Sequence, residues 1–329
     1  TEEPSEEPIE EEVEEITIPE PPVGSAETLP PSTIKQKVPD ADIVSGALVY
    51  QYPLISPAGR GGMQSGVNLS YNSQNTEEGS LVGHGWSLDL PSIERKNVNG
   101  LNKLYSSEDF SSSLDGDLKK VGSSSGTGNF AAKIDSGSFS KYAFTNDASG
   151  GTWTVKNKTG LTYTFGSSPE AKLSNPDDAT KVFRWHLSKV EDVKGNFVTY
   201  GYTKIDGQVY PATINYTGHG ADQGIYKVQF NLEDRSDKAM SAKYGFMVKT
   251  IKRVASVEVL VQNVVVGRYD LGYTQATPNQ RSLLSSVEFT GFDLAGQNGI
   301  TDGGMQFSYE SIGASNLMTK IKQNTGGET

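Results

Sequence analysis

The segments Tyr226-Lys227-Val228-Gln229-Phe230-Asn231-Leu232 and Val254-Ala255-Ser256-Val257-Glu258-Val259-Leu260-Val261 decide the fold class of this chain. In both, apolar side chains alternate with polar or small ones, which places the apolar side chains on one face of an extended strand. An amphipathic helix would instead repeat its apolar positions every three to four residues. Both segments are therefore predicted to be half-buried β-strands.

The same alternation of apolar and polar side chains is found along the chain from about Ile43 onward. Further alternating segments cover residues 66–71, 152–155 and 161–165. Because Gly and Asp adopt the positive φ that tight turns need, hairpin turns are predicted at Gly150-Gly151, Lys158-Thr159-Gly160 and Asp206-Gly207. No long amphipathic helix with capping residues is recognisable. The chain is predicted to be all-β, with large antiparallel multi-stranded sheets arranged as a sandwich or a shell.

Residues 1–40 differ from the rest in composition. They hold 8 of the 15 prolines, 11 glutamates and no aromatic residue, so they lack the apolar surface that would offset the entropy of ordering. We therefore expect a disordered acidic tether over residues 1–40. It is either a spacer that holds the folded part away from a membrane or wall, or a solvated tail without a specific role.

The net charge of -11 lies almost wholly in that segment. Residues 1–40 carry 12 acidic and 2 basic residues, whereas the remainder carries 28 acidic and 27 basic residues. A nearly neutral body without a Lys/Arg stripe lacks what phosphate-backbone binding requires, so nucleic acid is not an expected partner. No apolar run reaches the roughly 18–20 residues that cross a bilayer, so no direct membrane insertion is expected. The absence of cysteine excludes disulfides, thiolate nucleophiles and Cys-based zinc sites.

Neither the Ser/Gly-rich segment nor the three histidines predict a ligand site. Residues 121–128, rich in Ser and Gly, are predicted to be a flexible loop tip, because they lack the Gly-Lys-Ser/Thr ending and the strand-then-helix context of a phosphate-binding loop. The histidines His84, His186 and His219 form no pattern that would place two metal ligands together. We expect His84 to be a turn residue that donates to a backbone carbonyl, and His186 to face the side of its strand opposite Trp185.

Acidic residues offer candidate sites, each weighed against a structural role. Asp115-Gly116-Asp117 matches part of a calcium loop, but no bidentate Glu stands at the required later position, so a solvated turn is favoured. Glu233-Asp234-Arg235 is predicted to be a charged strand end, in which Arg235 forks onto a neighbouring carboxylate and locks the following turn. The carboxylates that could supply acid or base chemistry, if two met in a cleft, are Asp109, Glu191, Asp192, Glu233, Asp234 and Asp237.

A longer stretch carries a family resemblance. It reads Gly46-Ala47-Leu48-Val49-Tyr50-Gln51-Tyr52-Pro53-Leu54-Ile55-Ser56-Pro57-Ala58-Gly59-Arg60-Gly61-Gly62-Met63, and it continues through residues 69–73 to Gly83-His84-Gly85-Trp86-Ser87-Leu88. In physical terms it is a strand, a Pro/Gly-rich corner, a second strand and a bend whose glycines let the backbone turn around a buried indole. It resembles the opening of the amino-terminal domain of the SpvB family and its Rhs-type toxin relatives.

A second block, residues 183–202, is similar to the strand–turn–strand unit of Rhs and YD-repeat proteins. Within it Asp192 is expected to cap the turn, while Gly195 and Asn196 tolerate positive φ. The tyrosines expected to pack and hydrogen-bond there are Tyr200 and Tyr202. Stretches that follow in the family's order cover residues 210–218, 228–235 and 245–253.

The resemblance covers roughly residues 43–312 and sets the expected domain boundaries. Residues 1–40 form the tether, residues 41–312 the SpvB-like β domain, and residues 313–329 the start of a following Rhs/YD-type strand unit. SpvB-family members are best known for a carboxy-terminal ADP-ribosyltransferase, which uses an Arg, a Ser-Thr-Ser strand and a Glu-x-Glu pair. The folded part here has no such set, and the Glu-x-Glu spacing at residues 10–15 lies in the tether. The resemblance therefore implies no enzyme, no cofactor and no catalytic or metal-binding residue.

The resemblance also implies a function, because in toxin-complex B components and Rhs relatives such domains form part of a β-strand shell around a toxic cargo. The expected partners are later parts of the same polypeptide, including a carboxy-terminal toxin, or a separate toxin-complex subunit. The expected location is secreted, extracellular or at the bacterial cell surface, and toxin relatives also reach the host cytoplasm. Two alternatives remain: an adhesin that binds glycans or cell surfaces through exposed aromatics among the 15 tyrosines, and a hydrolase with an unseen carboxylate pair.

Overall fold

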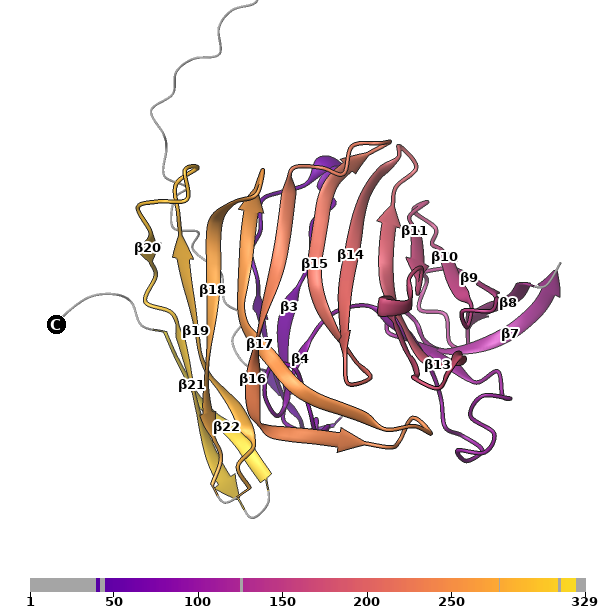
Figure 1. Ribbon diagram of the computed structural model, residues 1–329, viewed down its shortest axis with the longest axis horizontal. Helices are drawn as coiled ribbons and strands as arrows, with labels where there is room; N and C mark the ends of the chain where they lie inside the picture. The colour runs from indigo at the N-terminus through magenta and orange to yellow at the C-terminus, as the bar shows by residue number, and fades with distance from the viewer. Residues whose placement is uncertain (1–39, 42–44, 125–126, 278, 313–314, 324–329) are drawn as a thin grey trace, which may run out of the picture. The chain divides into compact units, whose positions relative to one another are not determined.

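Antiparallel strands dominate the computed structural model, which describes residues 40–41, 45–124, 127–277, 279–312 and 315–323 (Figure 1). The helical elements among these residues are two short 3-10 turns, η1 (Arg60–Gly62) and η2 (Pro169–Ala171). The all-β prediction is confirmed. The predicted tether lies outside the described residues, apart from Asp40.

The first strands form a small four-stranded sheet. Its order is β1 (Asp40–Ala41), β2 (Leu48–Pro53), β3 (Asn68–Asn72) and β4 (Trp86–Leu88). Alternation puts Tyr50, Tyr52, Leu69 and Tyr71 on its buried face. The bend before β4 is as predicted, because Gly83 and Gly85 take φ of 97° and 80° and the indole of Trp86 is fully buried.

A large antiparallel sheet makes up most of the rest. Each strand pairs with the next in the series β13 (Asp178–Glu191), β14 (Asn196–Ile205), β15 (Gln208–His219), β16 (Tyr226–Ser241), β17 (Val248–Val261), β18 (Val264–Gln275) and β19 (Ser282–Gly291). The other edge of β19 is shared by β20 (Ile300–Thr301) and β21 (Met305–Ile312), and β22 (Ser315–Gln323) pairs with β21. Each of the five segments expected from alternation coincides largely with a strand, although residues 66–67 and 161 precede β3 and β11, and the segments at residues 226–232 and 254–261 are parts of longer strands.

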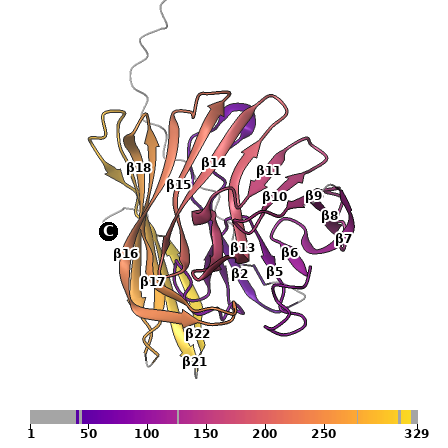
Figure 2. The ribbon, with the colours of Figure 1, turned by 45° about the vertical axis from the view of Figure 1, so that its right-hand side comes forward.

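Eight strands close into a ring, which we call the strand ring. Seven of them pair in chain order: β5 (Ser92–Arg95), β6 (Phe110–Ser112), β7 (Gly116–Ser124), β8 (Thr127–Ala132), β9 (Lys141–Thr145), β10 (Thr152–Lys156) and β11 (Thr162–Phe165). Both ends of this series pair with β13, since β5 joins residues 184–186 and β11 joins residues 187–191. Strand β12 (Lys172–Asn175) pairs with the first half of β13. Figure 2 shows the ring strands gathered beside the large sheet.

Two main cores result from this arrangement. The first fills the space between the small sheet and the large one, where Trp86 lies 4.8 Å from Phe307 and Tyr52 lies 6.3 Å from Tyr269, measured between ring centroids. The second lies inside the strand ring and is rich in aromatic side chains: Phe110, Phe130, Trp153, Phe165 and Trp185. Such rings bury large apolar areas and therefore dominate the stabilisation of each core.

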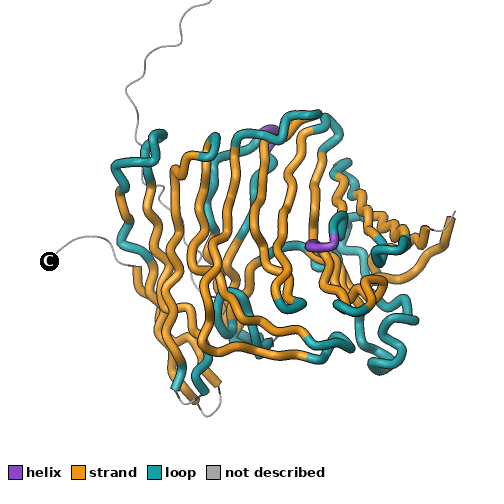
Figure 3. The backbone as a smooth tube through the Cα atoms, in the orientation of Figure 1, coloured by secondary structure: helices purple, strands orange, loops and turns teal. Residues whose placement is uncertain are grey.

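The predicted turns are found where the sequence places them, and Figure 3 shows the loops that join the strands. Gly150 and Gly151 turn β9 into β10, Gly160 turns β10 into β11, and Asp206-Gly207 joins β14 to β15, all with positive φ. One loop prediction was wrong: residues 121–124 and 127–128 are strand, and only 125–126 lie outside the described residues. The β7–β8 hairpin continues through Ser and Gly because its pairing is made by backbone groups, which every residue type carries.

Candidate functional site

The predicted fork of Arg235 exists and ties three parts of the fold together. Its Nε and Nη2 donate to the two carboxylate oxygens of Asp237 at 3.0 and 2.8 Å, and its Nη1 donates to the carbonyl of Ser80 at 2.9 Å. Asp237 also accepts from the backbone N–H and the hydroxyl of Ser282, at 2.6 and 2.5 Å. The group therefore holds the loop before β4 and the start of β19 onto β16.

The local setting of Arg235 differs from the prediction in one respect. Arg235 does not follow a strand end, because β16 continues to Ser241 and the residues between Asp234 and Ala239 form an irregularity in its pairing with β17. Burial alone would raise the pKa of Asp237, but hydrogen bonds from Arg235 and Ser282 outweigh it and lower the pKa to about 2. Side chains two residues apart in a strand point to the same face, so Arg235 and Asp237 lie side by side although the pairing with β17 is irregular here.

The face of the large sheet opposite the small sheet is polar. One row across β16 to β19 reads Gln229, Glu258, Arg268, Thr290 in register, and the next reads Asn231, Ser256, Asp270, Glu288. These side chains bond to one another: Asn231 Nδ2 donates to Ser256 Oγ at 3.1 Å and Arg268 pairs with Asp270 at 2.9 Å. Figure 1 looks onto this face, with β3 and β4 behind it. The sheet thus has one covered apolar face and one uncovered polar face.

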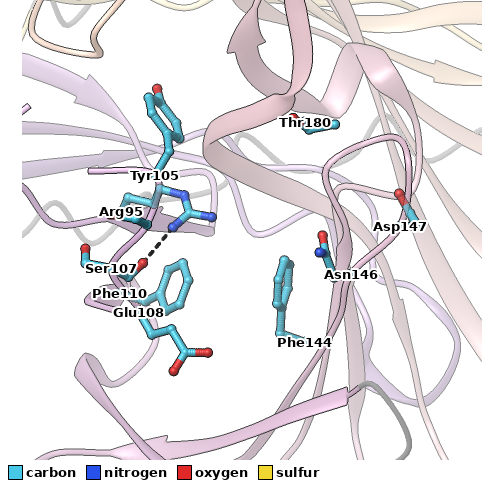
Figure 4. A pocket seen from close by; sticks show the side chains of 10 residues that line it. Arg95, Tyr105, Ser107, Glu108, Phe110, Phe144, Asn146, Asp147 and Thr180 are labelled. Carbon is cyan, nitrogen blue, oxygen red and sulfur yellow. Dashed lines mark hydrogen bonds between the residues drawn. The ribbon is translucent and has the colours of Figure 1, made fainter. Parts of the chain in front are cut away.

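A pocket of about 370 Å³ opens at one end of the strand ring. Its lining comes from β5, the loop before β6, β6 itself, the end of β9 with the loop after it, and β13. Figure 4 shows Arg95, Phe110 and Glu108 on one wall, with Phe144 and Asn146 on the other. The residues that line it are Arg95, Tyr105, Ser106, Ser107, Glu108, Phe110, Phe144, Asn146, Asp147 and Thr180.

The guanidinium of Arg95 is the notable group of this pocket. Its Nε donates to the carbonyl of Val182 at 2.9 Å, and its Nη1 donates to the carbonyls of Ser107 at 2.9 Å and Leu104 at 3.4 Å, whereas Nη2 has no hydrogen-bond or ion-pair partner within the described part of the chain. The guanidinium carbon lies 5.0 Å from the ring centroid of Phe110 and 5.5 Å from that of Trp185. Burial lowers the pKa of Arg95, yet an arginine remains charged at neutral pH. The pocket therefore holds a half-buried cation that forms no ion pair with a carboxylate of the described residues, although the charge of Glu108 acts on it through space.

The other polar groups of the pocket are mostly committed elsewhere. Both carboxylate oxygens of Glu108 accept from Lys120, at 2.7 and 2.8 Å. The pKa of Asp147 is lowered most by a hydrogen bond from the Ser149 hydroxyl. The backbone N–H groups of Gly151 and Ser149, which donate to Oδ1 of Asp147, lower it further. Asn146 is exposed at the rim, and no hydrogen bond is found for its side chain among the described residues. Arg95 and Asn146 are thus the groups able to take new partners.

The three histidines lie in separate places and have structural surroundings. The backbone N–H of His84, in the turn before β4, donates to the carbonyl of Ser282 at 2.8 Å, so the predicted contact is made by the main chain and not by the imidazole. His186 packs on Tyr202 with ring centroids 5.2 Å apart, on the opposite side from Trp185, as predicted. Burial, with Arg184 and Lys204 nearby, lowers the pKa of His186 to about 3. His219 is exposed at the end of β15.

The candidate carboxylates are likewise dispersed and paired. Glu191 pairs with Lys189 at 2.5 Å, Glu233 with Arg253 at 2.6 Å and Asp234 with Lys252 at 3.0 Å. Asp109 accepts from the amide of Asn99 at 3.3 Å. None of the six predicted carboxylates lines the pocket.

Two turn predictions have mixed outcomes. Asp192 caps its turn as expected, because its Oδ1 accepts from the backbone N–H groups of Lys194 and Asn196 at 2.8 and 2.9 Å. Gly195 has φ of 79°, but Asn196 begins β14 and does not take positive φ. Of the tyrosines, Tyr202 donates to the carbonyl of Leu187 at 2.7 Å, while Tyr200 packs against both main cores.

The acidic turn between β6 and β7 uses its carboxylates within the protein. Asp115 accepts from the hydroxyl of Tyr142, and Asp117 pairs with Lys96 at 2.5 Å. No group of three or more His, Asp or Glu side chains able to hold a metal ion occurs in the described residues. Nor does any helix in that part of the chain have the length and apolar character to cross a membrane.

Sequence reasoning missed the pocket residues. Arg95 and Asn146 stand in Ser92-Ile93-Glu94-Arg95 and Thr145-Asn146-Asp147, which look like ordinary strand ends and turns. They are brought together because β5 and β9 belong to one closed ring. No spacing in the sequence signals this meeting.

Comparisons with known proteins place this fold. The chain resembles TcdB2-TccC3 in its crystal structure, with TM-score 0.69, 19% identity, and coverage of 82% of this chain and 16% of that one. The match to the Photorhabdus luminescens Tc holotoxin pore has TM-score 0.69, 19% identity, and coverage of 83% and 16%. The amino-terminal domain of the effector SpvB from Salmonella typhimurium strain LT2 matches with TM-score 0.64, 16% identity, and coverage of 74% and 99%. At such identities the likeness shows the fold alone.

The extent of these matches differs. This chain spans about a sixth of the TcdB2-TccC3 chain, but it covers nearly all of the SpvB amino-terminal domain. Sequence comparison with curated proteins finds no match. The family model described as Salmonella virulence plasmid 65kDa B protein matches residues 43–232, which is more than half of the chain. The predicted family is confirmed, and the chain belongs to the SpvB family.

Proposed function

We propose that this chain is a non-catalytic section of a β-walled shell in a secreted bacterial protein of the toxin-complex and Rhs type, where it helps to enclose or deliver a toxin domain. The observation that carries the proposal is the two-layer construction of the large sheet. Its apolar face is covered by β2 to β4, and its other face carries rows of hydrogen-bonded polar side chains. A wall of this kind can border a water-filled interior without exposing apolar surface.

The fold relatives support a place in a larger assembly. The matched region makes up only 16% of the TcdB2-TccC3 chain, and a second match is named as a Tc holotoxin pore. By analogy, the partners of this chain are later parts of its own polypeptide or a separate toxin-complex subunit. Its location is then extracellular or at the bacterial surface. Residues 1–40 serve as tether, residues 41–312 as β domain and residues 313–329 as the start of the next unit.

The end of the large sheet suits continuation. Strand β22 pairs with β21 along one edge, and no other described strand pairs with its second edge. Met318 packs in the core between the sheets, and its backbone N–H donates to the hydroxyl of Tyr71 at 2.9 Å. Because an open edge invites pairing with another strand, a following strand of the same polypeptide would close it.

The test uses the complete polypeptide that carries this chain. Limited proteolysis measures how fast its carboxy-terminal region is cleaved. We expect that region to resist protease in the unaltered protein. Lys322→Pro removes a backbone N–H from β22 and blocks regular pairing, so it should make the region cleavable, whereas Lys322→Ala keeps the N–H and should leave it resistant. A carboxy-terminal region that is cleaved equally fast in all three proteins would overturn the shell proposal.

The adhesin alternative has no comparable support. All 15 tyrosines lie in the described residues, and each is buried or half-buried, so they form no exposed aromatic platform. The hydrolase alternative is weaker still, because the candidate carboxylates pair with separate partners.

A further inference from the structure

We infer that the pocket at the end of the strand ring binds a carboxylate-bearing sugar, such as a sialic or uronic acid. The first step of the argument is the charge of Arg95. Its guanidinium has two nitrogens bonded to backbone carbonyls and three aromatic rings beside it, while Nη2 has no protein partner among the described residues. A half-buried cation with a free N–H pair is an anion receptor, and hydrogen bonds between charged groups are about twice as strong as neutral ones.

The second step decides which anion fits. One guanidinium nitrogen offers two N–H donors, which suit a single carboxylate and fall short of the three oxygens of a phosphate. Asp147 and Glu108 also line the pocket, and of these Glu108 is neutralised by Lys120. The remaining negative charge of Asp147 disfavours a doubly charged ligand and leaves a monoanion as the matching class.

The third step concerns the body of the ligand. Phe110 and Phe144, whose ring centroids lie 6.1 Å apart and whose planes meet at 42°, give the two walls of the pocket an apolar lining. The rim adds the free amide of Asn146 (Figure 4). Apolar walls beside a guanidinium and a free amide match the C–H face and the hydroxyl groups of a sugar ring. A volume of about 370 Å³ lies at the lower end of the range for small-molecule pockets, so it suits one monosaccharide.

The test titrates the whole chain with sialic acid and glucuronic acid, and follows binding by saturation-transfer NMR and calorimetry. The matched ligands are the methyl ester of glucuronic acid, in which a neutral ester replaces the carboxylate, and benzoate, which has a carboxylate on an apolar ring. We expect saturable binding of at least one acidic sugar below about 20 mM and none of the ester. No saturation by either acid, or equal binding of acid and ester, overturns the proposal. Binding of benzoate alone overturns the assignment to a sugar.

Two variants localise the binding. Arg95→Gln should weaken it about tenfold or more, because it removes the charge. Asn146→Asp should also weaken it several-fold, because it adds a like charge at an exposed rim position that does not contribute to packing. Arg60→Gln removes an exposed arginine outside the pocket and should leave the affinity unchanged. If Asn146→Asp, which is expected to fold normally, keeps the full affinity, the pocket is not the site.

Discussion

At the scale of single residues, two tyrosines beside one indole differ in what their hydroxyl groups contact. Trp86 Nε1 donates to the hydroxyl of Tyr309 at 2.8 Å, and that hydroxyl donates to the carbonyl of Leu284 at 2.6 Å. Tyr50 packs edge-on against Trp86 with ring centroids 6.1 Å apart, but its hydroxyl is buried without a partner among the described residues. The hydroxyl of Tyr309 thus links the two sheets, whereas the hydroxyl of Tyr50 loses its hydration without gaining a hydrogen bond.

Tyr309→Phe should therefore lower the free energy of unfolding by about 1–3 kcal/mol, because it leaves the N–H of Trp86 and the carbonyl of Leu284 unpaired. Tyr50→Phe removes the same atom beside the same indole and should be neutral or slightly stabilising. Urea unfolding of both variants measures the difference. A larger loss for Tyr50→Phe than for Tyr309→Phe would contradict this account.

The buried fork predicts how stability depends on pH. Asp237 has a folded-state pKa of about 2, below the ordinary value of 3.8, so the stability it contributes is present above about pH 4 and is lost as the pH falls through 2. Asp237→Asn should reduce the free energy of unfolding at neutral pH by roughly 2 kcal/mol, and this deficit should shrink toward pH 2. Asp234→Asn, at an exposed carboxylate of the same strand, is the control. A deficit that is the same at pH 7 and pH 2.5 would count against the fork.

At the scale of elements, the bend before β4 and the β7–β8 hairpin show what local sequence can and cannot reveal. The Gly-x-Gly-Trp bend was predictable because positive φ and a buried indole are local requirements. The Ser/Gly hairpin was mistaken for a loop, because its composition disfavours strands while its place between β6 and β9 supplies pairing partners. In the β7–β8 hairpin the tertiary pairing therefore outweighed the low strand propensity of Ser and Gly, whereas in the bend before β4 the local preference and the tertiary structure agree.

The bend supplies a matched pair of glycine variants. Gly85→Ala should destabilise the fold by about 2 kcal/mol or more, since the new Cβ would lie 2.6 Å from Cε2 of buried Tyr71 at a φ of +80°. Gly116→Ala has a similar φ of +73° but open space around the new Cβ, so it should cost only about 1 kcal/mol of backbone strain. Thermal or urea denaturation compares the two. Equal losses would mean that packing against Tyr71 is unimportant.

At the scale of the whole molecule, the strand ring and the two-layer sheet have separate cores that meet at β13 and β14. Tyr200 and Met63 pack against both, but the most buried side chains of the two cores do not overlap. This arrangement allows the ring to open locally while the sheets stay paired.

Phe130→Ala, inside the ring, should therefore speed amide hydrogen exchange in β5 to β11 far more than in β16 to β19. Val257→Ala, in the core between the sheets, is the reciprocal control and should show the opposite pattern. Hydrogen exchange followed by mass spectrometry resolves the two regions. Equal acceleration everywhere in both variants would show that the molecule unfolds as one unit.

The sequence by itself determined the all-β class, the hairpin turns, the glycine bend around Trp86 and the fork of Arg235 onto a neighbouring carboxylate. These features depend on strand alternation, on φ, and on neighbours a few residues apart. Only the tertiary structure decided that β5 pairs with β13, about ninety residues later, and so closes the ring that brings Arg95 to Asn146. Many alternating strands can pair equally well by their backbones, so the choice among distant partners comes from how whole faces pack.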